Sequence, residues 1–512
     1  MTVEAQPTLT RRRLLQAGLV GAGAVAAGPV LWSRPGFAQA PEAGGVHLGF
    51  GADPTSQVRV TWSTPSSVTG AALDIGLDTS YGRVIAVDSA GLTGTPSVYH
   101  RTLVGGLTPD TRYRYRIRHS GGDPILGTFT TAPAGPAPFR FAAFGDMGVN
   151  ADAAAIVTQA AEANVDLALV VGDLCYANRV GGLNDGIPTD PAVWDTWLAQ
   201  VEQSAAAVPW LCTVGNHEME PEYGELGYDG FLTRVPLPGG GLAGAPTTWA
   251  VKYGSVGFVA LDANDASYEI TRNAGFVGAA QDAWLTATLA RLRADTAIDF
   301  IVVGFHHCAY CTNAVHGSDG GVRDRWGEIF DAHAVDLVVN GHNHSYERTH
   351  ALRGGAVVAE AAKGATVDSS TGTTYITAGG GGQAVYPAST HPVSYVTIDG
   401  GARVPELAPW SSVRVQDHSL IVADVVPPGS DGTTTMKVRA LDTTGAVVDE
   451  VTLRRSGARL KPPTNAPGSG AGRPTTPGAP LPSTGDLSGV AAGAALLAAA
   501  GVAAHRAGRL AD

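Results

Sequence analysis

Charge and cysteine are both scarce in this sequence of 512 residues. Charged residues make up 16% of the chain, the formal net charge is −12, and no basic tract occurs outside the N-terminus. A general nucleic-acid-binding role is therefore excluded, because it rests on clustered Lys and Arg. Four cysteines are too few for a disulfide scaffold in a chain of this length. No internal repeat is present either.

Apolar residues, by contrast, make up 44% of the chain, and Gly and Pro are abundant. This composition provides a sizeable core with many turns, and the length exceeds that of one ordinary domain.

Residues 41–133 show the alternation of apolar and polar residues that is typical of strands, and no helical period. Tyr113, Tyr115 and Ile117 fall on one face of a predicted strand and three arginines on the other. We therefore expect a small all-β sandwich, and "LTPDTRYRYRI" resembles a strand pair of a fibronectin type III domain. A Pro-rich linker, 131–138, follows it.

From residue 134 to 456 the pattern predicts a second domain of alternating strands and helices, an α/β fold. The expected helices are 151–163, 191–206, 279–293 and 323–333, and residues 413–455 are expected to add further strands. The other expected strands are 139–144, 166–171, 210–214, 256–261, 299–305, 335–339 and 373–378. Ligand sites in such sheets lie beyond the carboxyl ends of the strands.

The two ends of the chain resemble address signals. "TRRRLLQ", an apolar run and the small-residue site "AQA" resemble a twin-arginine signal over residues 1–40, which implies passage through the twin-arginine translocase. The alternative is a membrane anchor or a basic cytoplasmic arm.

"LPSTG", an apolar run and a basic tail resemble a sortase sorting signal over residues 481–512, after a Pro/Gly-rich linker at 457–480. The resemblance implies cleavage between Thr484 and Gly485 and transfer of Thr484 to cell-wall peptidoglycan. The alternative is a plain C-terminal membrane anchor. Both interpretations predict an exported, surface-tethered protein.

Five predicted strand ends carry side chains that can bind metals: "FGDMG", "VGDLCY", "VGNHE", "VGFHH" and "NGHNHSYER". Any one of these Asp residues alone would be interpreted as a turn cap. Together they place hard and borderline ligands at one sheet edge, enough for two metal ions. The candidate ligands are Asp146, Asp173, Tyr176, Asn216, His306, His342 and His344.

These motifs resemble the pattern GDxG, GDxxY, GNH(D/E), VxxH and GHxH of the calcineurin-like metallophosphoesterases, specifically the purple acid phosphatases. The resemblance covers about residues 41–455 and implies an αββα sandwich with two mixed sheets. It also implies that Asp146, Tyr176 and His344 bind Fe(3+). Asn216, His306 and His342 would bind a divalent ion (Fe, Zn or Mn), and Asp173 would bridge the two ions.

Tyr176 distinguishes this pattern from that of most phosphoesterases. Alone, a tyrosine after a strand is usually a core aromatic. Within GDxxY its phenolate is a hard anionic donor that favours a trivalent ion.

Other polar residues near these motifs have candidate roles. His217 is expected to bind the phosphate, and the resemblance points to His316 as the acid that protonates the leaving group. His307 is the alternative acid, or else a buried hydrogen-bonded histidine. Glu218 and Glu347 are expected to orient the metal-binding histidines.

The cysteines leave several interpretations open. Cys308 and Cys311 form a CxxC, for which we favour a small disulfide over free thiols, a redox role or a zinc site. Cys175 and Cys212 could also pair.

The sequence thus predicts a hydrolase of phosphate monoesters. A phosphodiesterase or nucleotidase on the same metal centre is the first alternative. A surface adhesion protein with a vestigial metal site is the second.

Overall fold

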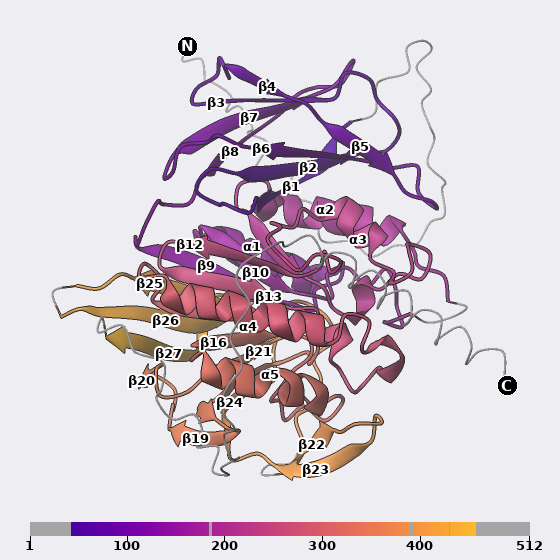
Figure 1. Ribbon diagram of the computed structural model, residues 1–512. Helices are drawn as coiled ribbons and strands as arrows, with labels where there is room; N and C mark the ends of the chain where they lie inside the picture. The colour runs from indigo at the N-terminus through magenta and orange to yellow at the C-terminus, as the bar shows by residue number, and fades with distance from the viewer. Residues whose placement is uncertain (1–41, 184–186, 390–392, 430, 457–512) are drawn as a thin grey trace, which may run out of the picture. The chain divides into compact units, whose positions relative to one another are not determined.

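The computed structural model describes residues 42–183, 187–389, 393–429 and 431–456. Its N-terminal part is a sandwich of two antiparallel sheets (Figure 1). The first sheet has the order β1 (Gly44–Phe50), β2 (Val58–Thr64), β6 (Val98–Val104) and β5 (Asp88–Gly91). The second has the order β4 (Arg83–Ile85), β3 (Ala72–Gly76), β7 (Arg112–Arg118) and β8 (Ile125–Thr130). Tyr113, Tyr115 and Ile117 of β7 are buried, as predicted.

The following part contains two mixed sheets. One has the order β11 (Trp210–Thr213), β10 (Leu167–Val171), β9 (Phe139–Phe144), β25 (Ser419–Val426), β26 (Thr433–Asp442), β27 (Val447–Ser456) and β20 (Thr366–Asp368). The other has the order β12 (Trp249–Tyr253), β13 (Val256–Ala260), β14 (Phe300–Gly304), β16 (Leu337–Asn340), β21 (Thr374–Ala378), β17 (Tyr346–Thr349) and β24 (Ser411–Val415). The C-terminal strands β25, β26 and β27 extend the first of these sheets, since β25 pairs with β9.

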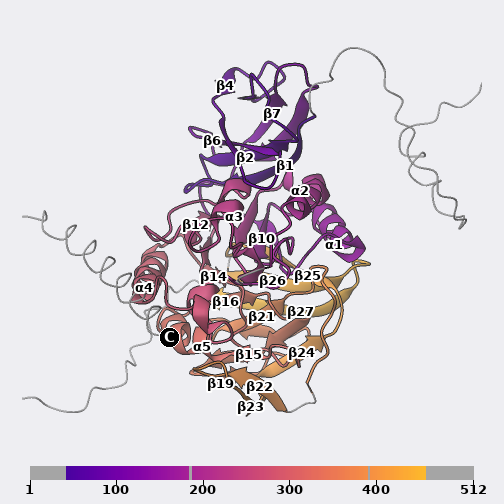
Figure 2. The same ribbon diagram turned by 90° about the vertical axis from the view of Figure 1, so that its right-hand side faces the viewer.

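The two mixed sheets pack face to face and helices lie outside them, which gives four layers (Figure 2). Alternate residues of β9 and β10, such as Phe141 and Leu169, share one apolar core with Phe258 and Val302 of the other sheet. Helices cover the opposite faces of the central strands, such as β10 and β14, which are therefore buried on both sides. These helices are α1 (Ala151–Glu162), α2 (Ala192–Ala205) and α3 (Asp229–Arg234) beside the first sheet, and α4 (Ala279–Ala294) and α5 (Gly320–Ala332) beside the second. The fold class is the predicted one.

Two of the helices, α1 and α5, begin at side-chain caps. The side chain of Asn150 accepts a hydrogen bond from the backbone of Ala153 at the start of α1, and Asp319 caps α5 in the same way. Both caps follow loops at the strand ends, so they fix the entry of the chain into the helix.

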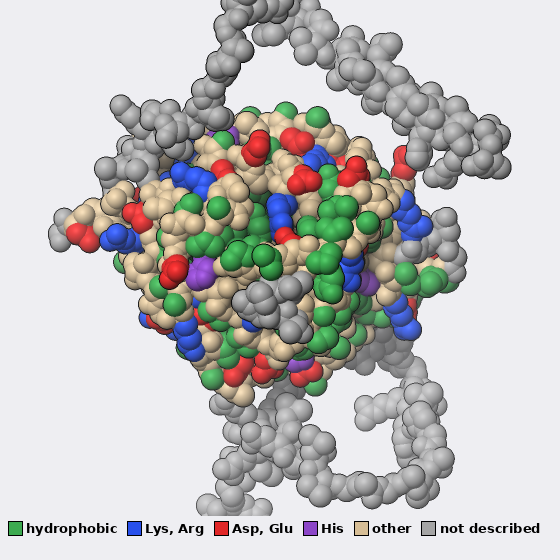
Figure 3. Space-filling view, turned by 90° about the horizontal axis from the view of Figure 1, so that it is seen from below, with side chains coloured by type: hydrophobic (Ala, Val, Ile, Leu, Met, Phe, Trp, Pro, Cys, Tyr) green, Lys and Arg blue, Asp and Glu red, His purple; other side chains and the backbone are tan. Residues whose placement is uncertain are grey.

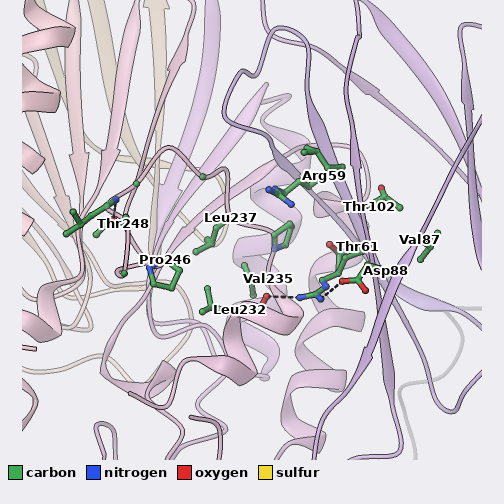
Figure 4. A pocket seen from close by; sticks show the side chains of 18 of the residues that line it. Arg59, Thr61, Val87, Asp88, Thr102, Leu232, Val235, Leu237, Pro246 and Thr248 are labelled. Atoms are coloured by element: carbon green, nitrogen blue, oxygen red, sulfur yellow. Dashed lines mark hydrogen bonds and ion pairs between the residues drawn. The ribbon is translucent and has the colours of Figure 1, made fainter. Parts of the chain in front are cut away.

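The sandwich packs on the second domain through β1 and α2. Glu202 of α2 accepts a hydrogen bond from the backbone of Gly45, and the hydroxyl of Tyr115 donates to the carbonyl of Ala206 at 2.6 Å. A cavity of about 930 Å³ lies between strands β2, β5 and β6 of the sandwich and the segment 232–248 of the second domain, and its lining includes Arg59, Thr61 and a glycine-rich loop at 239–244 (Figure 4). The predicted metal ligands do not line it.

Several small elements were not expected from the sequence. They include α3, β12, β17 and β20, the sheet of β15 (Ser318–Asp319), β22 (Val393–Thr397) and β23 (Arg403–Leu407), and the hairpin of β18 (Ala351–Arg353) and β19 (Ala356–Ala359). In the described ranges, no helix combines the length and the apolar character that crossing a membrane requires. Both predicted signals, with Thr484 and Gly485, lie outside the described residues.

The surface carries charges of both signs. On the face drawn in Figure 3, Lys and Arg are interspersed with Asp and Glu. Such a mixed surface creates no strong field of one sign over that face.

Candidate metal centre

The carboxyl ends of β9, β10, β11, β14 and β16 bring the predicted ligands together. These strands run parallel within each sheet, so their polar last turns gather at one edge. The loops after them are joined by backbone hydrogen bonds, including those from Asp146 to Gly172 and from Met147 to Asp173. All seven candidate ligands, from five separate stretches of sequence, lie at this edge.

The three residues predicted to bind Fe(3+) are in mutual contact. The Tyr176 hydroxyl lies 2.9 Å from Nε2 of His344 and donates to Oδ1 of Asp146 at 3.3 Å. His344 Nε2 lies 3.5 Å from the same carboxylate oxygen. A phenol, a carboxylate and an imidazole therefore point at one position.

The residues predicted to hold the divalent ion lie beside this group. His306 Nε2 is 3.0 Å from Oδ2 of Asp173 and 3.3 Å from Nδ1 of His342. It also lies 3.9 Å from Oδ1 of Asp146, which connects the two halves. Asp173, His306 and His342 have the spacing of a metal-binding group.

Asn216 shows that this half of the site is suited to a cation. Its side-chain oxygen is buried and accepts no hydrogen bond from the described residues. A buried oxygen without a donor is costly, and an oxygen-binding cation would satisfy it. The donor set of carboxylates, imidazoles, a phenol and an amide suits hard and borderline metals.

Each metal-facing histidine is held through its other ring nitrogen. His306 Nδ1 contacts the carbonyl of Val171 at 2.8 Å, and His344 Nδ1 contacts that of Ala384 at 3.0 Å. A proton on each Nδ1 leaves Nε2 free as a ligand, the usual arrangement in metal sites. His342 is turned the other way, with Nδ1 toward His306.

The backbone at the ligands is unusual. Asp146, Asp173, Tyr176 and His342 all have positive φ, between 53° and 65°. Non-glycine residues in this region cost about 1–3 kcal/mol each and cluster at functional sites. Gly341 permits the close approach here, because a Cβ at that position would lie 2.6 Å from Oδ2 of Asp146.

Burial and charge shift the pKa values of these groups in opposite directions. Burial raises the pKa of Asp146 well above its usual value. Burial also favours a higher pKa for Asp173, but the nearby His306 and His217 have the larger combined effect and lower the pKa of Asp173. Burial would lower the pKa of His306, yet Asp173 and Asp146 raise it to about 10. Within this buried group the pKa of each carboxyl depends on positive charge beside it, which His306 supplies in part and a bound cation would supply too.

The roles predicted for two glutamates are wrong. Glu218 was expected to orient a histidine, but it accepts hydrogen bonds from the backbone of Asp173, Leu174 and Gly215, and so ties two strand-end loops together. Burial raises its pKa to about 7. Glu347 contacts Thr312 and Ser411 instead of a histidine.

His217 lies at the edge of the centre. Its backbone donates to Oδ1 of Asp173, its Nε2 lies 3.8 Å from Oδ2 of that residue, and its Nδ1 contacts the carbonyl of Asn178. Its ring packs against that of Tyr176, with the centroids 4.2 Å apart. This arrangement directs the ring toward the metal-binding side chains.

Glu269, which the sequence analysis missed, contacts two histidines. Its carboxylate lies 2.5 Å from Nδ1 of His316 and 2.7 Å from Nε2 of His342. Tyr386, also missed, stacks on His344 with the ring centroids 4.0 Å apart. Neither belongs to a strand-end motif, so no local pattern marks them.

His307 has a packing role in the structure. Its ring lies 4.4 Å from that of His342 between centroids, and both of its nitrogens are buried without a partner among the described residues. The expectation of a buried hydrogen-bonded histidine is therefore wrong in its hydrogen bonding. Burial lowers its pKa well below the usual value.

The expected disulfides are not formed, because all four cysteines are free. The thiol of Cys308 instead donates to the carbonyl of Gly341 at 2.8 Å. That contact holds the loop of His306 against the loop of His342.

The chain matches the models of two known protein families. The model of the calcineurin-like phosphoesterase family matches residues 139–346, and that of the purple acid phosphatase N-terminal domain matches residues 43–131. An uncharacterized protein of Mycobacterium tuberculosis (strain H37Rv) is 34% identical, over 87% of this chain and 96% of its own.

Plant relatives and a solved structure extend the comparison. Purple acid phosphatase 1 of Ipomoea batatas is 29% identical, over 66% of this chain and 71% of its own. Fe(3+)-Zn(2+) purple acid phosphatase 12 of Arabidopsis thaliana is 28% identical, over 50% and 53%. The structure of purple acid phosphatase PPD1 from Lupinus luteus matches with a TM-score of 0.66 and 18% identity, covering 81% of this chain and 75% of that one.

The fold and the strand-end residues define a phosphoesterase hydrolase of the calcineurin-like class. Within this class, the chain belongs to the purple acid phosphatase family, whose N-terminal domain it also carries. These assignments oppose the interpretation as an adhesion protein.

Proposed function

We propose that this protein hydrolyses phosphate monoesters at a centre of Fe(3+) and a divalent ion. The observation that carries the proposal is the convergence of Asp146, Tyr176 and His344 on one position, beside His306, His342, Asn216 and Asp173. The name of the Arabidopsis relative, which specifies Fe(3+) and Zn(2+), supports the choice of metals.

The side chains suggest how the two ions would be held. Tyr176 offers a phenol and Asp146 a carboxylate, and His344 lies beside them. These oxygen donors favour the harder Fe(3+). His306, His342 and Asn216 suit the divalent ion, and Asp173, whose Oδ2 lies 3.0 Å from Nε2 of His306, would be shared by the two ions. When bound, the ions would supply the Lewis acidity that activates water and neutralises phosphate charge.

The remaining residues would bind and protonate the substrate. His217, at the rim beside Asp173, is positioned to donate a hydrogen bond to a phosphate oxygen. His316 is placed next to His342, with 4.1 Å between ring centroids. From there it would protonate the oxygen of the leaving alcohol.

The substrate test compares p-nitrophenyl phosphate with bis(p-nitrophenyl) phosphate, on purified protein loaded with metal. We expect a higher kcat/KM for the monoester. A preference for the bis-ester would contradict the proposal and favour a phosphodiesterase.

We further propose that the chain is exported and tethered to the cell wall by sortase. The twin-arginine and LPSTG patterns support this, together with the boundaries predicted at residues 40 and 481. Mass spectrometry of protein released from cell walls should find a mature N-terminus near Pro41 and a C-terminus at Thr484. Intact termini on protein from the native host would contradict both steps.

A further inference from the structure

The carboxylate of Glu269 contacts the rings of two histidines, His316 and His342. Oε1 lies 2.5 Å from Nδ1 of His316, and Oε2 lies 2.7 Å from Nε2 of His342. The residue comes from the loop after β13, which has no part in the strand-end motifs. The Glu269 side chain is 29% exposed, whereas that of His342 is 6% exposed.

The two contacts decide which nitrogen of each ring remains free. A proton on Nδ1 of His316 is held by Glu269, so Nε2 is the nitrogen left for a substrate. A proton on Nε2 of His342 is held in the same way, so Nδ1 is left to face His306, 3.3 Å away. A carboxylate that holds the far nitrogen of a histidine fixes both its tautomer and its orientation.

Glu269 also borders a cavity of about 340 Å³, lined in addition by Val180, Gly181, Ile270, Thr271 and Arg272. A Cβ added to Gly181 would lie 2.2 Å from Nδ2 of Asn216 and 3.3 Å from Nε2 of His217. Gly181, which lines this cavity, therefore packs against the side chains of Asn216 and His217, and Glu269 on the same cavity holds His316. Its wall combines apolar and polar side chains.

We propose that Glu269 is a positioning residue that aligns His316 to protonate the leaving alcohol, which occupies the cavity beside it. This inference rests on the proposed monoesterase function. As the oxygen of a water molecule bonds to phosphorus and the ester P–O bond breaks, the electron pair of the broken bond goes to the leaving oxygen, and that oxygen takes the proton from Nε2 of His316. The attacking water releases a proton to solvent, and the neutral ring regains one from solvent before the next turnover.

The test uses two leaving groups with metal-loaded full-length protein. p-Nitrophenolate leaves without protonation, whereas the alkoxide of glycerol 2-phosphate needs a proton. Glu269→Gln keeps the size of the side chain but can accept from only one of the two rings. We expect kcat for glycerol 2-phosphate to fall at least about tenfold, since general acids contribute about 10²–10⁴-fold. For p-nitrophenyl phosphate we expect kcat to stay within about threefold of wild type.

Three further variants and a metal analysis keep the result interpretable. Glu225→Gln makes the same chemical change at an exposed position, and kcat for both esters should stay at the wild-type value. His316→Ala should show the same selectivity for leaving group, and the double variant should lose little more than either single one, because both act on one step. Metal content of each variant, measured by elemental analysis, should match that of wild type.

Equal losses for both esters, no loss for either, or a loss that added metal restores would overturn the inference. Each of those results leaves wild-type monoesterase activity intact, so the proposed function would survive. Wild-type protein that hydrolyses neither ester would refute the proposed function, and this inference with it.

Discussion

At the scale of single residues, the site depends on which atom each side chain presents. Asn216 offers a buried oxygen with no donor in the described part of the chain, and His306 and His344 offer Nε2 because backbone carbonyls hold Nδ1. These atoms face the positions at which the ions would be held. Removing one of these side chains should therefore lower kcat strongly and change the stability of the fold little.

The prediction concerns Asn216→Ala. We expect kcat to fall by at least about 100-fold, because mutating even a residue that only contacts a metal ligand lowers metal affinity or activity by about 10–100-fold. The melting temperature of the metal-free protein should not fall, because the buried oxygen that lacks a donor is removed. Steady-state kinetics and thermal unfolding test both points. Unchanged turnover would rule out the assignment of Asn216 to the divalent ion.

At the scale of elements, the strands and helices near the centre could be predicted, and the contacts between them could not. Runs such as "LALVV" before Asp173 are buried on both faces, so their pattern is strong and the ligands at their ends could be found. The strands β22 and β23 form an edge sheet whose pattern is weak. Glu269 and Tyr386 reach the site only through tertiary packing, which no local pattern encodes.

The roles of Glu218 and the cysteines show the same limit. A motif places Glu218 beside a ligand, but only the three-dimensional structure shows that it binds backbone amides instead of a ring. Likewise, the spacing of Cys308 and Cys311 permits a disulfide, whereas the structure directs the first thiol to a carbonyl.

The close packing of two strand-end loops can be tested at Gly341. A Cβ there would meet Oδ2 of Asp146 at 2.6 Å and Nδ1 of His306 at 2.9 Å. We expect Gly341→Ala to reduce metal content and to lower the free energy of unfolding by about 1–3 kcal/mol, the usual cost of overpacking.

Gly327→Ala provides the matched control, because Gly327 lies within α5 and an added Cβ meets nothing within 4 Å. It should raise the free energy of unfolding by about 0.5–1 kcal/mol, through the higher helix propensity of Ala. Denaturant unfolding and elemental analysis compare the two variants. Equal metal content in both would contradict the steric account of Gly341.

At the scale of the whole molecule, a buried ion pair joins the two mixed sheets. Arg348 of β17 belongs to one sheet and Asp449 of β27 to the other, and both side chains have 0% exposure. Nε of Arg348 donates to the carboxylate at 2.6 Å, and the hydroxyl of Tyr346 donates to it at 2.7 Å. These bonds fix one sheet against the other and so fix the ligands that each contributes.

Asp449→Ala should destabilise the fold strongly, because it leaves the Arg348 charge buried and uncompensated. We expect a loss of about 3–5 kcal/mol in the free energy of unfolding. The partly exposed pair of Lys437 and Glu450 is the control, and Glu450→Ala should lower the free energy of unfolding by no more than about 1 kcal/mol. Urea unfolding of both variants measures the difference, and equal costs would contradict the role given to the buried pair.

The central claim is that side chains from five strand ends hold two metal ions, one of them ferric and bound to Tyr176. Elemental analysis combined with the visible absorption spectrum, on wild type and Tyr176→Phe, tests it most directly. We predict close to two metal ions per wild-type chain, the number that a two-metal site holds, with iron among them. We also predict a visible band that disappears in the variant. A wild-type protein that is fully active, colourless and free of iron would contradict the claim.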